Sequence, residues 1–258
     1  MRIPILMYHS VSEAADGSFG PFAVRPGDFS AQMALLAELG HATLTVADLA
    51  VRLVAGQALP ARPVVVTFDD GFKDFMSHAL PVLAAHRLVA TQYVVSDLVG
   101  ATSRWLDDVG EGGRPLMDAA AVREAHAAGI EIGAHTRTHP RLDALAPDRL
   151  HDEVAGSKAR IEDMLGAPVT TFAYPFGLYE GAREIVREAG FAAACAVRYR
   201  TSFPGDDRFA LARLIVRRDT GLDAFGKLLD GDDASLRMTF DRTRAAAWRV
   251  VRRAMRRG

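Results

Sequence analysis

Short apolar runs alternate with longer amphipathic stretches along this chain, and this alternation limits the folds open to it. Runs rich in Val, Ile, Phe or Tyr are too short for helices, so we predict strands there: residues 3–11, 63–68, 90–96, 130–134, 170–173, 191–197 and 211–217. Longer stretches repeat apolar residues at helical spacing: residues 26–39, 46–55, 75–86, 118–128, 147–165 and 179–189. Several of these stretches are followed by glycine, as helix ends often are.

Repeated strand-then-helix units with continuously apolar strands indicate a parallel sheet covered by helices, an α/β fold. About seven strands in one domain could close into a barrel, and an open doubly wound sheet is the alternative. Both architectures build their sites at the carboxyl ends of the strands. No glycine-rich nucleotide-binding motif follows any of these strands.

Polar groups gather where predicted strands end. His9 follows Ile-Leu-Met-Tyr, Asp69 and Asp70 follow Val-Val-Val-Thr-Phe, and His135 and His139 follow Ile-Glu-Ile-Gly-Ala. Two adjacent carboxylates resist joint ionisation, and a bound metal would relieve that conflict. Two imidazoles and one carboxylate would leave coordination positions open, as in catalytic metal sites. The second carboxylate could then act as a base.

These residues lie in stretches that resemble the signature motifs of the NodB-type polysaccharide deacetylases. Residues 67–71 (Thr-Phe-Asp-Asp-Gly) are similar to the first motif, residues 135–139 (His-Thr-Arg-Thr-His) to the second, and residues 172–177 (Phe-Ala-Tyr-Pro-Phe-Gly) to the third. The opening residues 7–11 (Met-Tyr-His-Ser-Val) resemble the branch that contains poly-N-acetylglucosamine deacetylases. The resemblance covers roughly residues 3 to 220 and implies an irregular (β/α)7 barrel in a single domain.

The resemblance also implies roles for individual residues. Asp69 would be the general base, and Asp70, His135 and His139 would bind one divalent metal, commonly zinc, with cobalt or nickel as substitutes. The backbone N–H of Phe176 would help to hold the oxyanion. Four residues are expected to contact or shape the substrate site: Tyr8, Tyr174, Pro175 and Arg213.

The chain departs from the family pattern in two places. The arginine that usually opens the third motif and orients the base is replaced by Ala173, and Arg213 could supply that charge from another direction or form a surface salt bridge. The late Asp-x-x-Trp and Leu-x-His motifs are missing, and with them the usual general acid. His9 is the remaining histidine at a strand end, and we expect it to be the acid, or else to bind substrate or orient Asp69.

The implied function is removal of acetyl groups from an N-acetylated sugar through a metal-bound water activated by Asp69. The substrate would be a polysaccharide, an oligosaccharide or a lipid-linked glycan. Two alternatives stay open: a cytosolic amidase for a non-sugar amide, and a carbohydrate-binding protein without turnover. The intact base Asp69, which binding alone would not need, argues against the second alternative, whereas the amidase would use the same chemistry.

Composition bears on location and partners. A formal net charge of -1 gives no support for a nucleic-acid partner. The first residues lack the long apolar region of a signal peptide, and no apolar run is long enough to span a membrane, which favours a cytoplasmic protein. Residues 1–240 are expected to form the catalytic domain. Residues 241–258 carry seven arginines against one aspartate, and this basic tail could lie on an anionic membrane.

Overall fold

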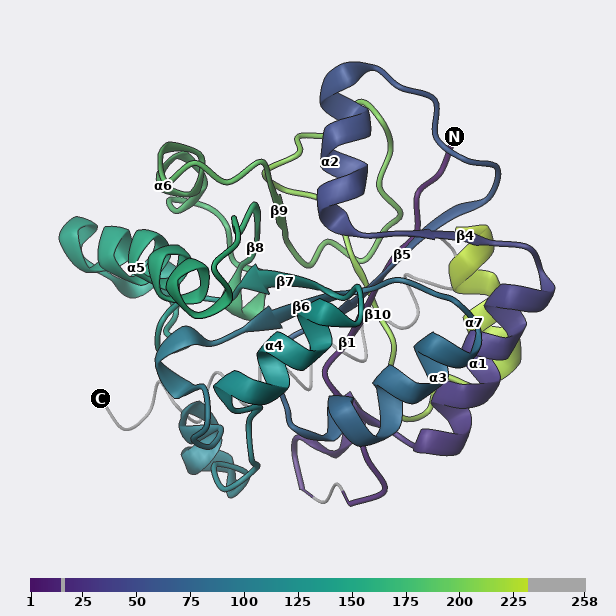
Figure 1. Cartoon of the computed structure of the whole chain (residues 1–258), viewed down its shortest axis with the longest axis horizontal. Coiled ribbons are helices and arrows are strands. Elements are labelled where there is room, and N and C mark those ends of the chain that lie inside the picture. Colours follow the sequence, from purple (N-terminus) through teal and green to yellow (C-terminus); the bar gives the residue numbers. More distant parts are fainter. Residues whose placement is uncertain (15–16, 232–258) are drawn as a thin grey trace.

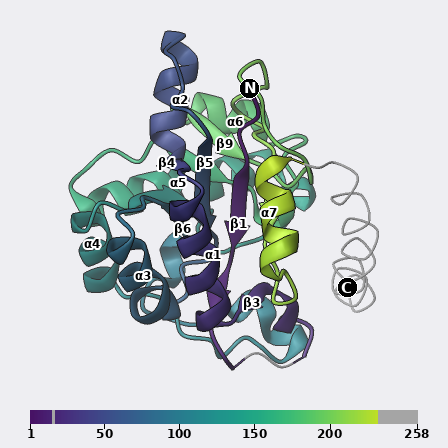
Figure 2. The same ribbon diagram turned by 90° about the vertical axis from the view of Figure 1, so that its right-hand side faces the viewer.

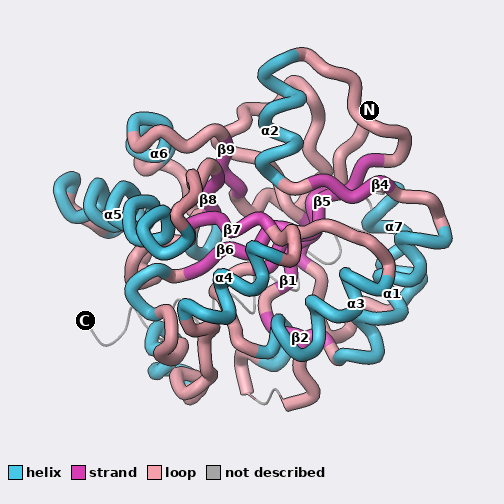
Figure 3. Tube along the Cα trace, viewed as in Figure 1, coloured by secondary structure: helices cyan, strands magenta, loops and turns pink. Residues whose placement is uncertain are grey.

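The computed structural model describes residues 1–14 and 17–231, and its centre is an eight-stranded parallel sheet (Figures 1 and 3). The strands along it run in the order β10-β1-β5-β6-β7-β8-β9, and β4 lies beside β5. Their bounds are β1 Ile5–Tyr8, β4 Ala42–Leu44, β5 Pro63–Phe68, β6 Thr91–Val94, β7 Glu131–Ala134, β8 Thr171–Ala173, β9 Ala193–Cys195 and β10 Leu214–Ile215. A separate short pair joins β2 (Ser10–Val11) to β3 (Ala23–Val24).

Helices surround the sheet, with most of them packed on its outer face (Figure 1). They are α1 Pro26–Glu38, α2 Val46–Ala55, α3 Leu80–Ala85, α4 Ala119–Ala127, α5 Pro147–Leu165, α6 Arg183–Glu188 and α7 Leu222–Asp230. Each predicted helix is present, although the stretch at residues 75–86 begins as a π-helix (Phe75–Ala79) before α3. The short strand β4 and the helix α7 were not predicted.

The two edges of the curled sheet are joined by the segment at residues 208–215. Within it, Leu211 exchanges backbone hydrogen bonds with β9, donating to Ala194 O at 3.0 Å while its carbonyl accepts from Ala196 N at 2.8 Å. A few residues later the same segment becomes β10 and pairs with β1. The sheet therefore closes on itself, which confirms the predicted (β/α)7-type barrel and excludes the open doubly wound sheet.

Side chains alternate between two cores, as the two-residue period of a strand requires. Ile5, Val65 and Tyr93 belong to the core inside the barrel. Their neighbours Leu6 and Val66 belong to the larger core between the strands and the outer helices. Because one face of each strand points inward, every second residue at the carboxyl end is aimed at the barrel axis.

Helix α2 lies over the amino ends of the strands, at the end of the barrel where β1 begins (Figure 2). Its first turn is held by a capping box between Thr45 and Asp48. The Glu131 carboxylate, at the start of β7, accepts hydrogen bonds from Ala47 N at 3.0 Å and from Thr91 Oγ1 at 2.7 Å. This end of the barrel is therefore covered, and the carboxyl ends of the strands form the open end.

Two sequence predictions concern membranes: a basic tail that could lie on a membrane surface, and the lack of a membrane-spanning segment. The basic tail at residues 241–258 lies outside the described residues. Within residues 1–14 and 17–231, no helix is both long enough and apolar enough to cross a membrane.

Gly133 on β7 generates a testable prediction about the barrel core. A Cβ at this position would lie 2.4 Å from Cε1 of Tyr93 and 2.9 Å from Oγ1 of Thr171. We expect Gly133→Ala to lower the free energy of unfolding by about 1–3 kcal/mol through overpacking, measured by urea denaturation. Gly27→Ala is the control, because no atom lies within 4 Å of a Cβ built on this glycine of α1. An equal loss in both variants would contradict the packing argument.

Candidate active site

Asp69 and Asp70 sit where β5 ends, at the open end of the barrel. Asp69 continues the sheet, since its N–H donates to Tyr8 O at 3.0 Å. The chain then turns sharply, with φ of 77° at Asp70 and 78° at Gly71. Each aspartate is only 3% exposed. The turn sends the two neighbouring carboxylates in different directions, toward different partners.

His135 and His139 follow β7 in a tight strand-to-loop turn. His135 is still hydrogen bonded to the sheet through its N–H, which donates to Val94 O at 3.0 Å. The turn closes when His139 N donates to Oγ1 of Thr136 at 2.9 Å. Thr136 and His139 both have left-handed backbone conformations, with φ of 66° and 62°. This turn brings two imidazoles four residues apart to one point.

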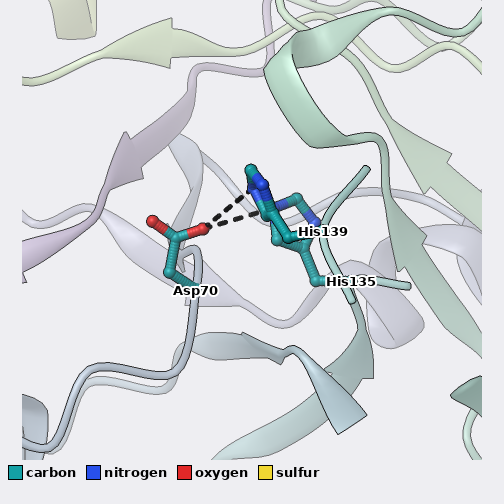
Figure 4. A group of neighbouring side chains, drawn as sticks. All are labelled: Asp70, His135 and His139. Carbon is teal, nitrogen blue, oxygen red and sulfur yellow. Dashed lines mark ion pairs between the residues drawn. The ribbon is translucent and has the colours of Figure 1, made fainter. Parts of the chain in front are cut away.

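Asp70, His135 and His139 form a buried cluster whose ligand atoms all lie within 4.8 Å of one another. Asp70 Oδ1 is 3.5 Å from His135 Nε2 and 3.3 Å from His139 Nε2 (Figure 4). Burial alone would raise the pKa of Asp70, but the nearby rings of His135 and His139 outweigh it and hold that pKa far below its usual value. Asp70 is therefore the carboxylate that the two histidines share.

The hydrogen bond on the far side of His135 tests whether this cluster fits a metal. His135 Nδ1 lies 2.7 Å from Ala173 O, and a carbonyl can only accept, so Nδ1 must carry the proton. In the neutral ring, Nε2 then presents a lone pair to the Asp70 carboxylate. Two acceptors facing each other call for a cation between them. A metal-binding histidine usually donates the N–H of its other ring nitrogen to a carbonyl or carboxylate, as His135 does here. The donor set thus fits a divalent ion.

Asp69 is held by Arg213, a residue of the segment that closes the barrel. The guanidinium binds both carboxylate oxygens, with Nη1 to Oδ1 at 2.6 Å and Nη2 to Oδ2 at 2.7 Å. Its Nε donates to Ala196 O at 3.3 Å, and the side chain is completely buried. Burial would raise the pKa of Asp69, yet the charge of Arg213 lowers it below its ordinary value of 3.8. Asp69 is therefore ionised and fixed in orientation.

Aromatic residues surround the histidines at the open end. Trp105, in the short helix η4 (Arg104–Val109), stacks on the ring of His139 with a centroid distance of 4.6 Å. Phe176 contacts the same imidazole edge-on at 5.0 Å and is 45% exposed. The half-buried ring of His9 lies 5.2 Å from that of Phe22. The site is thus flanked by flat apolar faces.

His9 lies near the charged centre, since the charges of Asp70 and Asp69 act on it. Burial nevertheless lowers the pKa of His9 below 6.5. Among the described residues, no group forms a hydrogen bond with its buried Nδ1.

The expected substrate residues are placed differently from one another. Tyr8 and Tyr174 are fully buried, and their hydroxyls donate to Gln32 Oε1 at 2.8 Å and to Phe209 O at 2.9 Å. Pro175 is buried in the turn before Phe176, and Arg213 is buried beneath Asp69. The expectation of direct substrate contact is therefore revised for Tyr8, Tyr174 and Arg213, whose polar atoms are used inside the protein.

Trp105 was not predicted as a site residue. It lies in the glycine-rich stretch at residues 100–115, outside the strands, helices and motifs that the sequence indicates. Its distance along the chain from both histidines left no spacing signal that could have connected them.

Comparison with known proteins identifies the family. The polysaccharide deacetylase family profile matches residues 56–194, more than half of the 258 residues. The chain therefore belongs to the polysaccharide deacetylase family, as the three motifs indicated. This result and the site geometry agree, because the matched region contains Asp69, Asp70 and both histidines.

Individual relatives are more distant. YxkH of Bacillus subtilis, provisionally assigned as a polysaccharide deacetylase, is 27% identical over 230 residues, 89% of this chain and 76% of that protein. The poly-beta-1,6-N-acetyl-D-glucosamine N-deacetylase of Escherichia coli K12 is 31% identical over 154 residues, 56% of this chain but only 22% of that protein. The deacetylase PplD of Streptococcus pyogenes, solved with acetate, superposes with a TM-score of 0.76 at 23% identity, covering 89% of this chain and 98% of that one. The last likeness concerns the fold.

The Arg213–Asp69 pair predicts a pH-dependent loss of stability. Arg213→Met leaves Asp69 buried without its cation, so we expect the free energy of unfolding near neutral pH to fall by about 3–5 kcal/mol. In the wild type the pKa of Asp69 is below 3.8, so the pair stabilises the fold above that pH and is lost as pH falls through the lowered pKa. In the variant, burial raises the pKa of Asp69, and protonation relieves the penalty as pH falls.

The difference between wild type and variant should therefore shrink from about pH 7 to about pH 4 in urea denaturation experiments. Arg25→Met is the matched control, because Arg25 pairs with Asp28 at 3.5 Å with both side chains about half exposed. Its effect should stay within about 1 kcal/mol. A loss of stability in Arg213→Met that is the same at both pH values would contradict a role of the pair in ionising Asp69.

Proposed function

We propose that this protein is a metal-dependent hydrolase that removes the acetyl group from an N-acetylated sugar. The observation that carries the proposal is that the two adjacent aspartates have different partners. Asp69 is bound on both oxygens by Arg213, whereas Asp70 faces His135 and His139. One carboxylate is thus available as a base and the other as a ligand.

Asp70, His135 and His139 would hold the metal. Two imidazole nitrogens and one carboxylate oxygen suit zinc, and cobalt or nickel accept the same donors. A bound dication would lower the pKa of a coordinated water and polarise the acetyl carbonyl. Of the three residues, His139 is the most exposed, at 7%.

Other groups of the site would supply the base, the oxyanion donor and the acid. Asp69, ionised and fixed by Arg213, accepts a proton from the attacking water. The backbone N–H of Phe176, in a turn where φ is 58°, would donate to the oxyanion. His9 would donate a proton to the departing amine. Arg213 acts through Asp69 and is a positioning residue.

An N-acetylated glycan is the substrate class with most support. The printed activity of the Escherichia coli relative is deacetylation of poly-beta-1,6-N-acetyl-D-glucosamine. Flat faces at Trp105, Phe176 and Phe22 offer the kind of surface on which the apolar face of a pyranose ring can pack. We extend the relative's substrate class, and not its particular polymer, to this chain.

Loss of the ligands and loss of the base should have different effects. We expect His135→Ala/His139→Ala to lose both bound metal and acetate release from chitooligosaccharides. Asp69→Asn should keep its metal and lose about 10²–10⁴-fold in kcat. Metal content by elemental analysis and acetate release, with and without a chelator, measure both.

His151→Ala is the control, because this histidine lies exposed on α5 and should affect neither quantity. Full metal content in the double histidine variant would refute the ligand assignment. Near-normal kcat in Asp69→Asn would refute the base. A wild type that binds metal but releases acetate only from small non-sugar acetamides would replace the glycan by an amidase substrate.

His9 gives a separate prediction, because an amine leaves only when protonated and an activated phenol leaves without help. We expect His9→Gln to lower kcat on N-acetylated sugars by about 10²-fold or more while sparing aryl acetate esters with activated leaving groups. The ratio of the two rates in wild type and variant is the measurement. Equal losses on both substrates would make His9 a positioning residue.

A further inference from the structure

The turn between the two histidine ligands is held in a conformation that its own residues do not favour. Thr136 and His139 both have left-handed φ values, of 66° and 62°. Such a conformation is unfavourable for a side chain with a Cβ, and most of all for a β-branched residue such as threonine. Neither position is a glycine, so the surrounding structure must stabilise this turn.

Glu153 on α5 is the residue that contacts the middle of this turn. Its side chain is completely buried. One carboxylate oxygen, Oε2, accepts from Arg137 N at 2.8 Å and from Thr138 N at 2.9 Å. The other, Oε1, accepts from Thr138 Oγ1 at 2.6 Å and from Arg149 Nη2 at 2.9 Å. Three of the four donors thus belong to the two residues between Thr136 and His139.

These contacts use up the two amides that the turn exposes. Successive N–H groups that point in one direction form a concavity for an anion, and here the anion is a side chain of the protein. Arg149 lies on the other side of the carboxylate and supplies the balancing charge. A buried carboxylate with four donors is well satisfied, which makes it a rigid support for the turn.

Backbone bonds support the same turn from the opposite side. Ser96 N donates to Thr136 O at 3.1 Å, and Asp97 N donates to Arg137 O at 3.0 Å. The carbonyls of the turn are thus bound by the segment after β6, and its amides by Glu153. The two contacts together fix the backbone that carries both imidazoles.

We propose that Glu153 is a positioning residue of the metal site, which sets the relative placement of His135 and His139 by binding the turn between them. The inference rests on the proposed metal site but concerns a residue outside all three motifs. Without Glu153, the amides of Arg137 and Thr138 lose their acceptor and the left-handed turn loses its main side-chain support. Metal binding then has to order the two imidazoles itself, and this cost lowers the metal affinity.

Glu153→Gln is the test variant, because it keeps the size of the side chain but replaces one acceptor oxygen by an NH2 group that faces donors. The probe is Co²⁺, added to the metal-free full-length chain and followed by its visible absorption and by competition with a chelator. We expect Glu153→Gln to weaken Co²⁺ affinity by about 10–100-fold, the usual range for residues that orient metal ligands. We also expect an altered absorption spectrum, which a merely structural change elsewhere would not produce.

Glu162→Gln is the matched control. Glu162 lies on the same helix and also binds a following loop. It accepts hydrogen bonds from Val169 N at 2.9 Å and from Lys158 Nζ at 2.7 Å, and neither donor belongs to the turn between the histidines. Its variant should keep wild-type Co²⁺ affinity and spectrum. The urea denaturation midpoints of both metal-free variants show how much stability each has lost.

Thr138→Val keeps the test open if Glu153→Gln does not fold. It removes one of the four bonds to Glu153, and we expect Co²⁺ affinity to fall by about fivefold, as the loss of one ordinary hydrogen bond implies. Wild-type affinity and spectrum in Glu153→Gln, or in Thr138→Val when that variant has to replace it, would overturn the inference. So would an equal loss of affinity in Glu162→Gln. Failure of the wild type itself to bind Co²⁺ would instead refute the proposed metal site.

Discussion

The rest of the site depends on two neighbouring carboxylates that are both buried at one end of the barrel. Asp69 and Asp70 could not both ionise in this position without separate compensation. The turn at Asp70 separates their directions, so that Arg213 neutralises one and the pair of histidines shares the other. The two compensations come from opposite sides of β5, since Arg213 directly precedes β10 and the histidines follow β7.

Reversal of the chain at the strand ends is the second condition of this site. Seven non-glycine residues of the described chain have positive φ, and four of them lie at the site: Asp70, Thr136, His139 and Phe176. Each strand must stop and turn back while its last side chain still points to the barrel axis. The strain is tolerated because side chains and neighbouring strands bind the turns, as Glu153 does for the histidines.

Replacement of the third-motif arginine by Ala173 is compatible with a fixed base because of barrel geometry. The residues that end β8 and those that begin β10 face the same interior space, so a long side chain from either strand can reach Asp69. Arg213 does so while its guanidinium lies 5.7 Å from the centre of the Tyr93 ring. The small side chain at position 173 leaves room there, and its carbonyl orients His135.

Most strands and helices, the location of chemistry at strand ends and the cluster of Asp70, His135 and His139 could be predicted from the sequence. Periodicity and the Asp-Asp-Gly and His-x-x-x-His spacings made this possible, because they are local properties of the chain. The sequence left open whether the sheet closes and where Arg213 points. It did not indicate Trp105 or Glu153, since no local pattern links residues 15 to 144 positions apart. Tyr8 and Tyr174 were predicted as substrate residues because they lie in or beside the motifs. Side chains alternate between the two faces of a strand, however, and both tyrosines point into the outer core. These points depend on the tertiary structure, since distant strands, helices and loops come into contact only when the whole chain folds.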